Sequence, residues 1–202
     1  MNEAKIRLSD SEKELVSDAH WILTKNRIME KGMQLLGQLQ ARYAGILNRH
    51  QQLPASLLQS SPKISRGENY RGLPWLVLDY PRLFGKEDVL AVRTLFWWGH
   101  FFSITLQVAG AYQRKFEQTI IAGYPLLRKA GYSVCIADDP WQHHFETDHY
   151  RLIAEMNQEE FTAVCGSKDF IKIAIRYPVT AWEEVDEIFA DEFRRIIEML
   201  EG

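Results

Sequence analysis

Apolar side chains recur every seven residues through the first quarter of the chain. The repeating positions are Leu15, Ile22, Met29, Leu36 and Tyr43. This spacing is typical of one stripe along a helix. Ser9 and Glu12 can form a capping box at its start, and no proline precedes Pro54. The pattern therefore predicts one long helix from about residue 10 to residue 50.

A helix of that length would measure about 60 Å at 1.5 Å per residue. A globular chain of 202 residues has a radius of gyration of about 16 Å, so the helix would overhang its own domain. Gly32, Gly37 and Gly45 could bend it back over the body. We favour the alternative that a second copy covers the overhang, giving a homodimer through the N-terminal helix.

After residue 50 the pattern changes. Residues 51–72 are rich in Ser, Pro and Gly and are predicted to be a connector. Beyond them, short apolar runs bounded by turn residues predict strands. The predicted strands cover 73–80, 89–98, 101–108, 133–137 and 169–177. In the third of these, Ser103, Thr105 and Gln107 alternate with apolar residues, so we expect one of its faces to be wetter.

Helical spacing returns in three later segments. They cover 111–130, interrupted near Pro125, then 157–165, and finally 180–200, where Thr180 and Glu183 can cap the start. A hairpin at Gly99 and His100 favours antiparallel pairing. We therefore predict an α+β fold, with a mostly antiparallel sheet packed with a long N-terminal, a middle and a C-terminal helix. The expected organisation is one domain over 1–202, made of a helical segment 1–50 and a sheet-containing body 73–202.

Composition and charge exclude several function classes. The formal net charge is −3 and the isoelectric point is about 6.1, which disfavours nucleic acid as a partner. Two cysteines are too few for a disulfide framework, and the N-terminus lacks an apolar leader, so we expect a cytoplasmic protein. The apolar stretch 95–111 carries polar residues and is rich in aromatic and β-branched side chains, so it suits a buried sheet better than a membrane span.

The densest polar cluster covers residues 138–149, DDPWQHHFETDH, which hold four acids and three of the six histidines. Imidazole and carboxylate groups both bind divalent metals. We name His144, Glu146 and His149 as candidate metal ligands, which would make the protein a metal-dependent hydrolase. The alternative is a solvated polar loop, since no established metal-binding signature is present.

An arginine-rich segment at 63–82 is a second candidate site. Arg66, Asn69, Arg71 and Arg82 could bind a phosphate- or carboxylate-bearing ligand, because guanidinium presents a planar fork of donors. The alternative is that these arginines stay solvated or pair with acids. Asp79, which stands near Arg82, is expected to form an Asp–Arg pair that fixes a turn.

Five aromatic residues fall within positions 96–102. Trp97 and Trp98 could line a ligand pocket or a subunit interface, or they could simply fill the core. Taken together, these patterns favour a cytoplasmic protein that acts through binding or homo-oligomeric assembly rather than catalysis. The metal-dependent hydrolase and the anion binder are the alternatives.

Overall fold

One seven-stranded sheet organises the computed structural model, which describes residues 6–201. The strands are β1 (Lys63–Tyr70), β2 (Leu73–Phe84), β3 (Val89–Trp97), β4 (Phe101–Ala109), β5 (Ser133–Cys135), β6 (Tyr150–Leu152) and β7 (Phe170–Pro178). Their order is β1-β2-β3-β4-β7-β5-β6, and every pair is antiparallel. The predicted α+β class is therefore confirmed. Residues 1–5 and 202 of the predicted domain lie outside the described residues.

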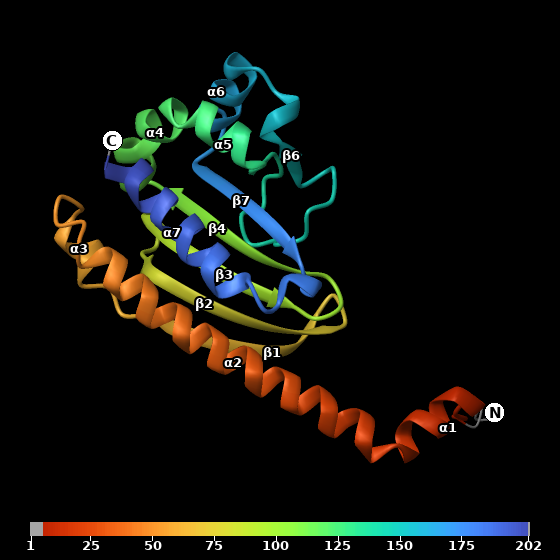
Figure 1. Cartoon of the computed structure of the whole chain (residues 1–202). Helices are drawn as coiled ribbons and strands as arrows, with labels where there is room; N and C mark the ends of the chain where they lie inside the picture. The colour runs from red at the N-terminus through yellow and green to blue at the C-terminus, as the bar shows by residue number, and fades with distance from the viewer. Residues whose placement is uncertain (1–5, 202) are drawn as a thin grey trace.

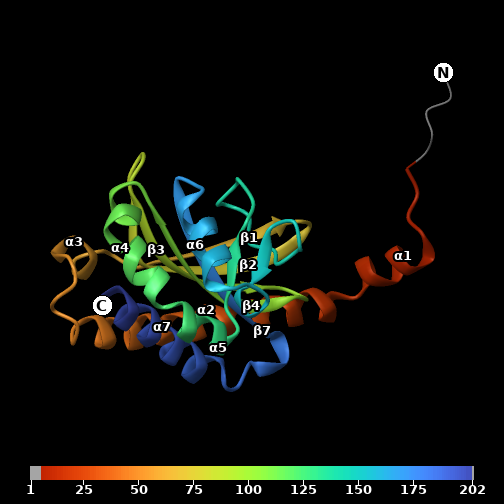
Figure 2. The same cartoon turned by 90° about the horizontal axis from the view of Figure 1, so that it is seen from above.

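Helices cover one face of this sheet and one of its ends. They are α1 (Asp10–Ser17), α2 (Ala19–Leu47), α3 (Ala55–Leu58), α4 (Ala111–Ala122), α5 (Tyr124–Ala130), α6 (Gln158–Gly166) and α7 (Val185–Glu201), with short 3-10 turns at Ile153–Glu155 and Val179–Ala181. Figures 1 and 2 show α2 and α7 side by side on the same face. The expected long N-terminal, middle and C-terminal helices are all present.

The long N-terminal helix is broken near its start. The break falls at Asp18, whose backbone is not helical and whose carboxylate caps α2 by accepting from the N–H of His20 at 2.9 Å. The prediction of one continuous helix was therefore wrong. The Asp18 carboxylate accepts hydrogen bonds from backbone N–H groups that a continuous helix would pair with its own carbonyls. The glycines that could have bent it lie within an unbroken α2.

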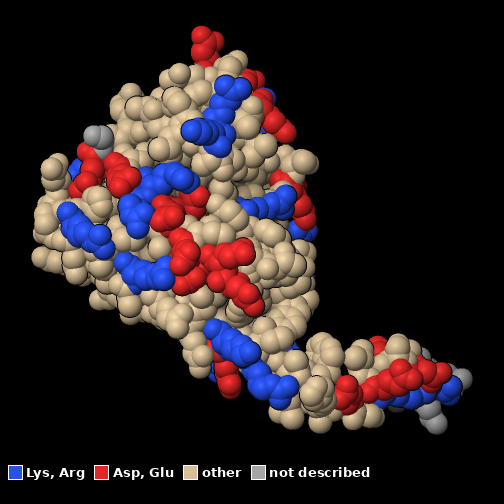
Figure 3. Space-filling model, viewed as in Figure 1, with Lys and Arg blue, Asp and Glu red and all other residues tan. Residues whose placement is uncertain are grey.

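Residues 6–23 form an arm that stands out from the body (Figures 1 and 3). Every residue of the arm is exposed, and α1 buries none of its side chains. The overhang expected from the length of the helix is therefore present. The arm is shorter than the overhang of one continuous helix would be, because the chain changes direction at Asp18.

The main core lies between the helical layer and the inner face of the sheet. Tyr43 of α2 stacks on Phe193 of α7 with ring centroids 3.8 Å apart. The Tyr43 hydroxyl lies 2.9 Å from the Thr94 hydroxyl of β3, so the buried polar groups satisfy each other. Gly32 lets α2 approach β2 closely, because a Cβ there would lie 2.5 Å from a methyl carbon of Leu76.

Several predicted boundaries were wrong. Strand β1 lies inside the predicted connector 51–72; as an edge strand it has one neighbour and lacks the apolar alternation of a covered strand. Strand β2 continues past residue 80 to Phe84 after a bulge. The middle helix divides at Gly123 rather than Pro125, because proline is tolerated in the first turn of α5. The last helix begins at Val185, after a 3-10 turn, rather than at Thr180.

The stretch 95–111 forms the end of β3, the turn, and all of β4. Within residues 6–201, no helix is both long and apolar enough to cross a bilayer. The turn between the two strands falls at the predicted positions, Gly99 and His100. Strand β7, close to the C-terminus, lies between β4 and β5 and so joins the two parts of the sheet.

Candidate functional site

The sheet face that α2 and α7 leave uncovered carries a row of polar side chains. Lys63, Asp79, Arg93 and Thr105 stand directly opposite one another on β1 to β4. Side chains at opposed positions of antiparallel strands lie on the same face, about 5 Å apart. The register of the strands therefore assembles this row from residues that are distant in sequence.

Asp79 and Arg93 form the centre of the row. The Arg93 guanidinium donates to both carboxylate oxygens of Asp79, over 2.7 Å from Nε and 3.1 Å from Nη2. The pair is largely buried, with side-chain exposures of 8% for Asp79 and 18% for Arg93. The Asp–Arg pair expected at Asp79 is thus made with Arg93 and not with Arg82.

The loop that links β5 to β6, residues 136–149, covers part of this face. Arg93 Nη1 donates over 2.7 Å to His143 Nε2, so the imidazole is neutral and carries its proton on Nδ1. Burial lowers the pKa of His143 well below its usual value, and the charges of Lys172 and Arg93 lower it further. His143 therefore holds the loop to the sheet as a hydrogen-bond acceptor.

Lys172 of β7 is a second attachment point for this loop. Its side chain is almost fully buried, and Nζ donates to the carbonyl oxygens of Pro140, at 2.8 Å, and Gln142. Burial lowers the pKa of Lys172 to about 7. The Tyr70 hydroxyl accepts from the backbone N–H of His143 at 2.7 Å, which fastens the loop to the end of β1 as well.

This loop also explains why the polar face of β4 is dry. Ser103, Thr105 and Gln107 are buried, so the expectation that this face is wetter was wrong. The loop and the neighbouring charged side chains exclude water from it, an arrangement that strand periodicity alone does not reveal.

A cleft of about 510 Å³ opens between this loop and the first three strands. Its lining is Lys63, Ser65, Asn69, Tyr70, Trp75, Val77, Asp79, Arg82, Phe84, Arg93, Leu95, Trp141 and His143. Phe84 and Trp141 meet at the rim, with ring centroids 5.9 Å apart, and are 41% and 50% exposed. Aromatic rings exposed beside convergent polar groups are typical of a small-molecule site.

The cleft has an excess of positive charge. Three basic side chains line it, against the single carboxylate of Asp79, which Arg93 already holds. Within residues 6–201, neither Lys63 nor Arg82 forms an ion pair. Their charges are therefore available to a ligand.

The structure divides the predicted anion-binding set. Asn69 and Arg82 line the cleft. Arg66 is exposed on the other face of β1, opposite Leu76. Arg71, in the turn between β1 and β2, forms an ion pair with Glu146.

The two predicted tryptophans lie apart from the cleft. Trp97 is buried and donates its indole N–H to the carbonyl of Tyr70 over 3.2 Å, and its ring stacks on His100 at 3.6 Å. Trp98 packs against Phe96 and the main core.

Sequence reasoning missed Arg93 and Trp141. Arg93 is the one charged residue in the strand VLAVRTLFW, and that isolation is a signal that could have found it. Trp141 lies in the polar stretch 138–149, where no periodicity marks it.

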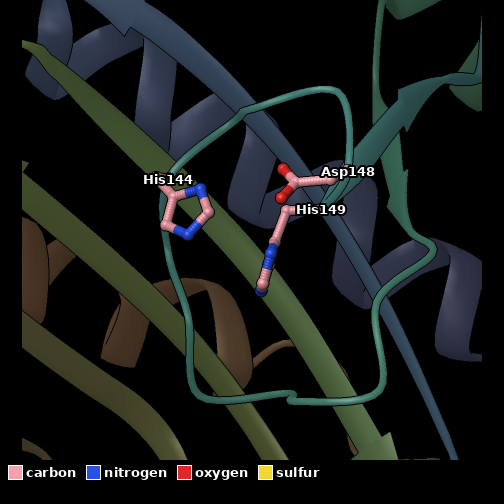
Figure 4. Close-up of side chains that lie close together, drawn as sticks. All are labelled: His144, Asp148 and His149. Atoms are coloured by element: carbon pink, nitrogen blue, oxygen red, sulfur yellow. The ribbon is translucent and has the colours of Figure 1, made fainter.

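Two of the three predicted metal ligands come together. Ligand atoms of His144, Asp148 and His149 lie within 4.8 Å of one another (Figure 4). Glu146 is instead paired with Arg71, and its other oxygen lies 3.6 Å from His144 Nδ1. Asp148 thus takes the position that sequence reasoning gave to Glu146. These ligand types suit Zn²⁺ and other divalent transition metals.

Comparisons of the chain with protein-family models, with curated proteins and with solved structures give no match.

Proposed function

We propose that the protein binds a small organic anion with a flat ring in the cleft between β1–β3 and the 136–149 loop. The observation that carries this proposal is that Lys63 and Arg82, which have no acid partner among residues 6–201, stand among exposed aromatic rings. An arginine fork binds carboxylate or phosphate, and Trp75 or Trp141 offers a face for stacking. The volume of the cleft, about 510 Å³, suits a ligand of metabolite size.

The chemistry of the cleft favours binding over catalysis. Both carboxylate oxygens of Asp79 accept hydrogen bonds from Arg93, and His143 Nε2 accepts one from the same guanidinium. These groups hold the site together, leaving Lys63 and Arg82 to contact the ligand. The two buried, unpaired cysteines are compatible with a reducing compartment, so we propose that the protein acts in the cytoplasm.

The experiment is a thermal-shift titration of the full chain with benzoate, indole-3-carboxylate, a nucleoside monophosphate and inorganic phosphate. A ligand at 100 times its dissociation constant adds about 2.7 kcal/mol, or roughly 5–10 °C in melting temperature for a chain of this size. Arg82→Gln and Lys63→Gln should remove that shift.

Arg66→Gln is the matched control, because Arg66 shares strand β1 with Lys63 but lies on the opposite face. It should retain the full shift. The proposal would be overturned if no anion raised the melting temperature, or if Arg66→Gln lost the shift as fully as Arg82→Gln does.

A second candidate function is self-assembly through the arm. Five large apolar side chains of the arm are each more than half exposed: Ile6, Leu15, Val16, Trp21 and Leu23. Isolated helices shorter than about 12–15 residues are marginal in water, and α1 has 8 residues, none of them buried. The arm therefore needs a surface to fold against, and a second copy offers an identical apolar one.

A further inference from the structure

The loop that covers the sheet brings two imidazoles and a carboxylate together. His144 lies where the loop passes over the sheet, and Asp148 and His149 come just before β6. A turn places the last two, because the His149 N–H donates to the carbonyl of Glu146 over 2.9 Å. Figure 4 shows the three side chains close together within the ring of chain that the loop forms. The loop backbone thus brings together three ligand types suited to one ion.

Two nitrogens in this cluster have no partner. Among the described residues, neither His144 Nδ1 nor His149 Nε2 forms a hydrogen bond, and both atoms are buried. His144 is more than nine-tenths buried, with an exposure of 8%. Buried polar atoms are almost always satisfied in folded proteins, so an unpaired imidazole nitrogen in each of two neighbouring rings calls for an explanation. A metal ion bound by both rings would supply it.

Glu146 has a different part in the arrangement. Its carboxylate is held by Arg71 across the gap to the β1–β2 turn, and its free oxygen stays 3.6 Å from His144 Nδ1, beyond hydrogen-bond distance. The ion pair ties the loop to the hairpin and leaves the His144 nitrogen free. The ligand set therefore contains the neighbouring acid, Asp148.

We propose that His144, Asp148 and His149 bind one divalent transition-metal ion that fastens the 136–149 loop over the sheet. Zinc bound by nitrogen and oxygen at about 2.0–2.2 Å places its ligand atoms roughly 3.3–3.5 Å apart. Because the ligand atoms of the three side chains lie within 4.8 Å of one another, they need to move together by at most about 1.4 Å to bind the ion. With three protein ligands, a fourth position stays open to water. None of the three residues lines the cleft, so this site is separate from the proposed anion site.

The test uses the full chain, stripped with chelator and titrated with Zn²⁺ by calorimetry, with Co²⁺ absorption as an optical readout of the ligands. One ion per chain is expected. His144→Ala and His149→Ala should abolish the stoichiometric site. Asp148→Asn, an exposed position that leaves the fold intact, should weaken it at least about tenfold, the smallest effect that even indirect partners of a ligand show.

Two controls separate this site from adventitious binding. His20→Ala removes an exposed histidine of the arm, and Glu146→Gln removes the acid that Arg71 holds; both variants should still bind one ion. The proposal is overturned if the stripped wild type takes up no Zn²⁺, or if Asp148→Asn binds as tightly as the wild type does. The proposal would also be overturned if His20→Ala lost Zn²⁺ binding to the same extent as His144→Ala, since that result would mean that Zn²⁺ binds unspecifically to histidines.

Discussion

Arg93 donates two parallel hydrogen bonds to Asp79 and a third, from its remaining amino group, to His143. One guanidinium thus joins two central strands and the loop that covers them. Its partners come from positions 14 and 50 residues away in sequence. The floor of the cleft depends on this single side chain.

Arg93→Met should therefore destabilise the fold strongly. It leaves the Asp79 carboxylate largely buried without a counter-charge, and breaking such a pair costs about 3 kcal/mol or more. Urea unfolding measures the loss. Arg66→Met, at an exposed position of the neighbouring β1, should change the free energy of unfolding by no more than about 0.5 kcal/mol.

The double variant Asp79→Leu, Arg93→Met provides the further check. Because it removes both charges of the pair and leaves neither one buried without the other, it should be more stable than Arg93→Met alone. A double variant whose destabilisation equals the sum of the two single losses would show that the residues act independently.

Lys172 should make stability rise with pH above neutrality. Its pKa in the folded protein is about 7 against an ordinary 10.5, so between these values the unfolded chain holds a proton that the folded chain lacks. Stability then increases with pH, by at most about 1.4 kcal/mol per unit. The titratable or charged groups around its ammonium are Arg93, Cys135, Asp139, His143 and Tyr150.

Urea unfolding at pH 7.0, 7.5 and 8.0 measures this slope. The two cysteines, whose thiols begin to ionise in the unfolded chain near pH 8, contribute equally to the wild type and to a Lys172 variant. Lys172→Met should flatten it. If the wild type and the variant share the same slope, Lys172 does not carry the pH dependence.

Gly32 and Gly37 should respond to alanine in opposite directions. At Gly32 a new Cβ would lie 2.5 Å from Leu76, whereas at Gly37 nothing lies within 4 Å. Gly32→Ala should cost about 1–3 kcal/mol through overpacking, and Gly37→Ala, at an exposed helical position, should gain about 0.5–1 kcal/mol. Thermal unfolding of the two variants decides this, and a stabilised Gly32→Ala would mean that α2 sits further from β2.

The arm should control the assembly state. Sedimentation equilibrium of the full chain should give a dimer, with about twice the chain mass of 23.6 kDa. The double variant Leu15→Glu, Trp21→Glu should give the mass of the monomer. Both positions are exposed, so the fold should survive. The control variant Lys13→Gln, which like Leu15→Glu changes α1, should remain dimeric. A wild type that stays monomeric at 100 μM would exclude this assembly.

The helices and the central hairpins could be predicted from the sequence because each pattern is local. The capping box expected at Ser9 forms, and the turn between β3 and β4 falls at Gly99 and His100. Strand β1 was missed because an edge strand needs little hydrophobic alternation.

The sites depend on long-range register and on an irregular loop. Asp79 meets Arg93 only because β2 and β3 align those two residues. Asp148 replaces Glu146 beside the histidines because Arg71, from another hairpin, holds Glu146. Local periodicity carries no information on either relationship.

The position of β7 governs when the sheet can form during synthesis. The strand is made of residues 170–178, yet it sits between β4 and β5. A nascent chain that has emerged only as far as β6 has two sheet fragments and no strand to join them. Helix α7, which covers the inner core, emerges later still. Completion of the sheet therefore waits until residues 170–178 have left the ribosome, and until then β4 presents an unpaired edge.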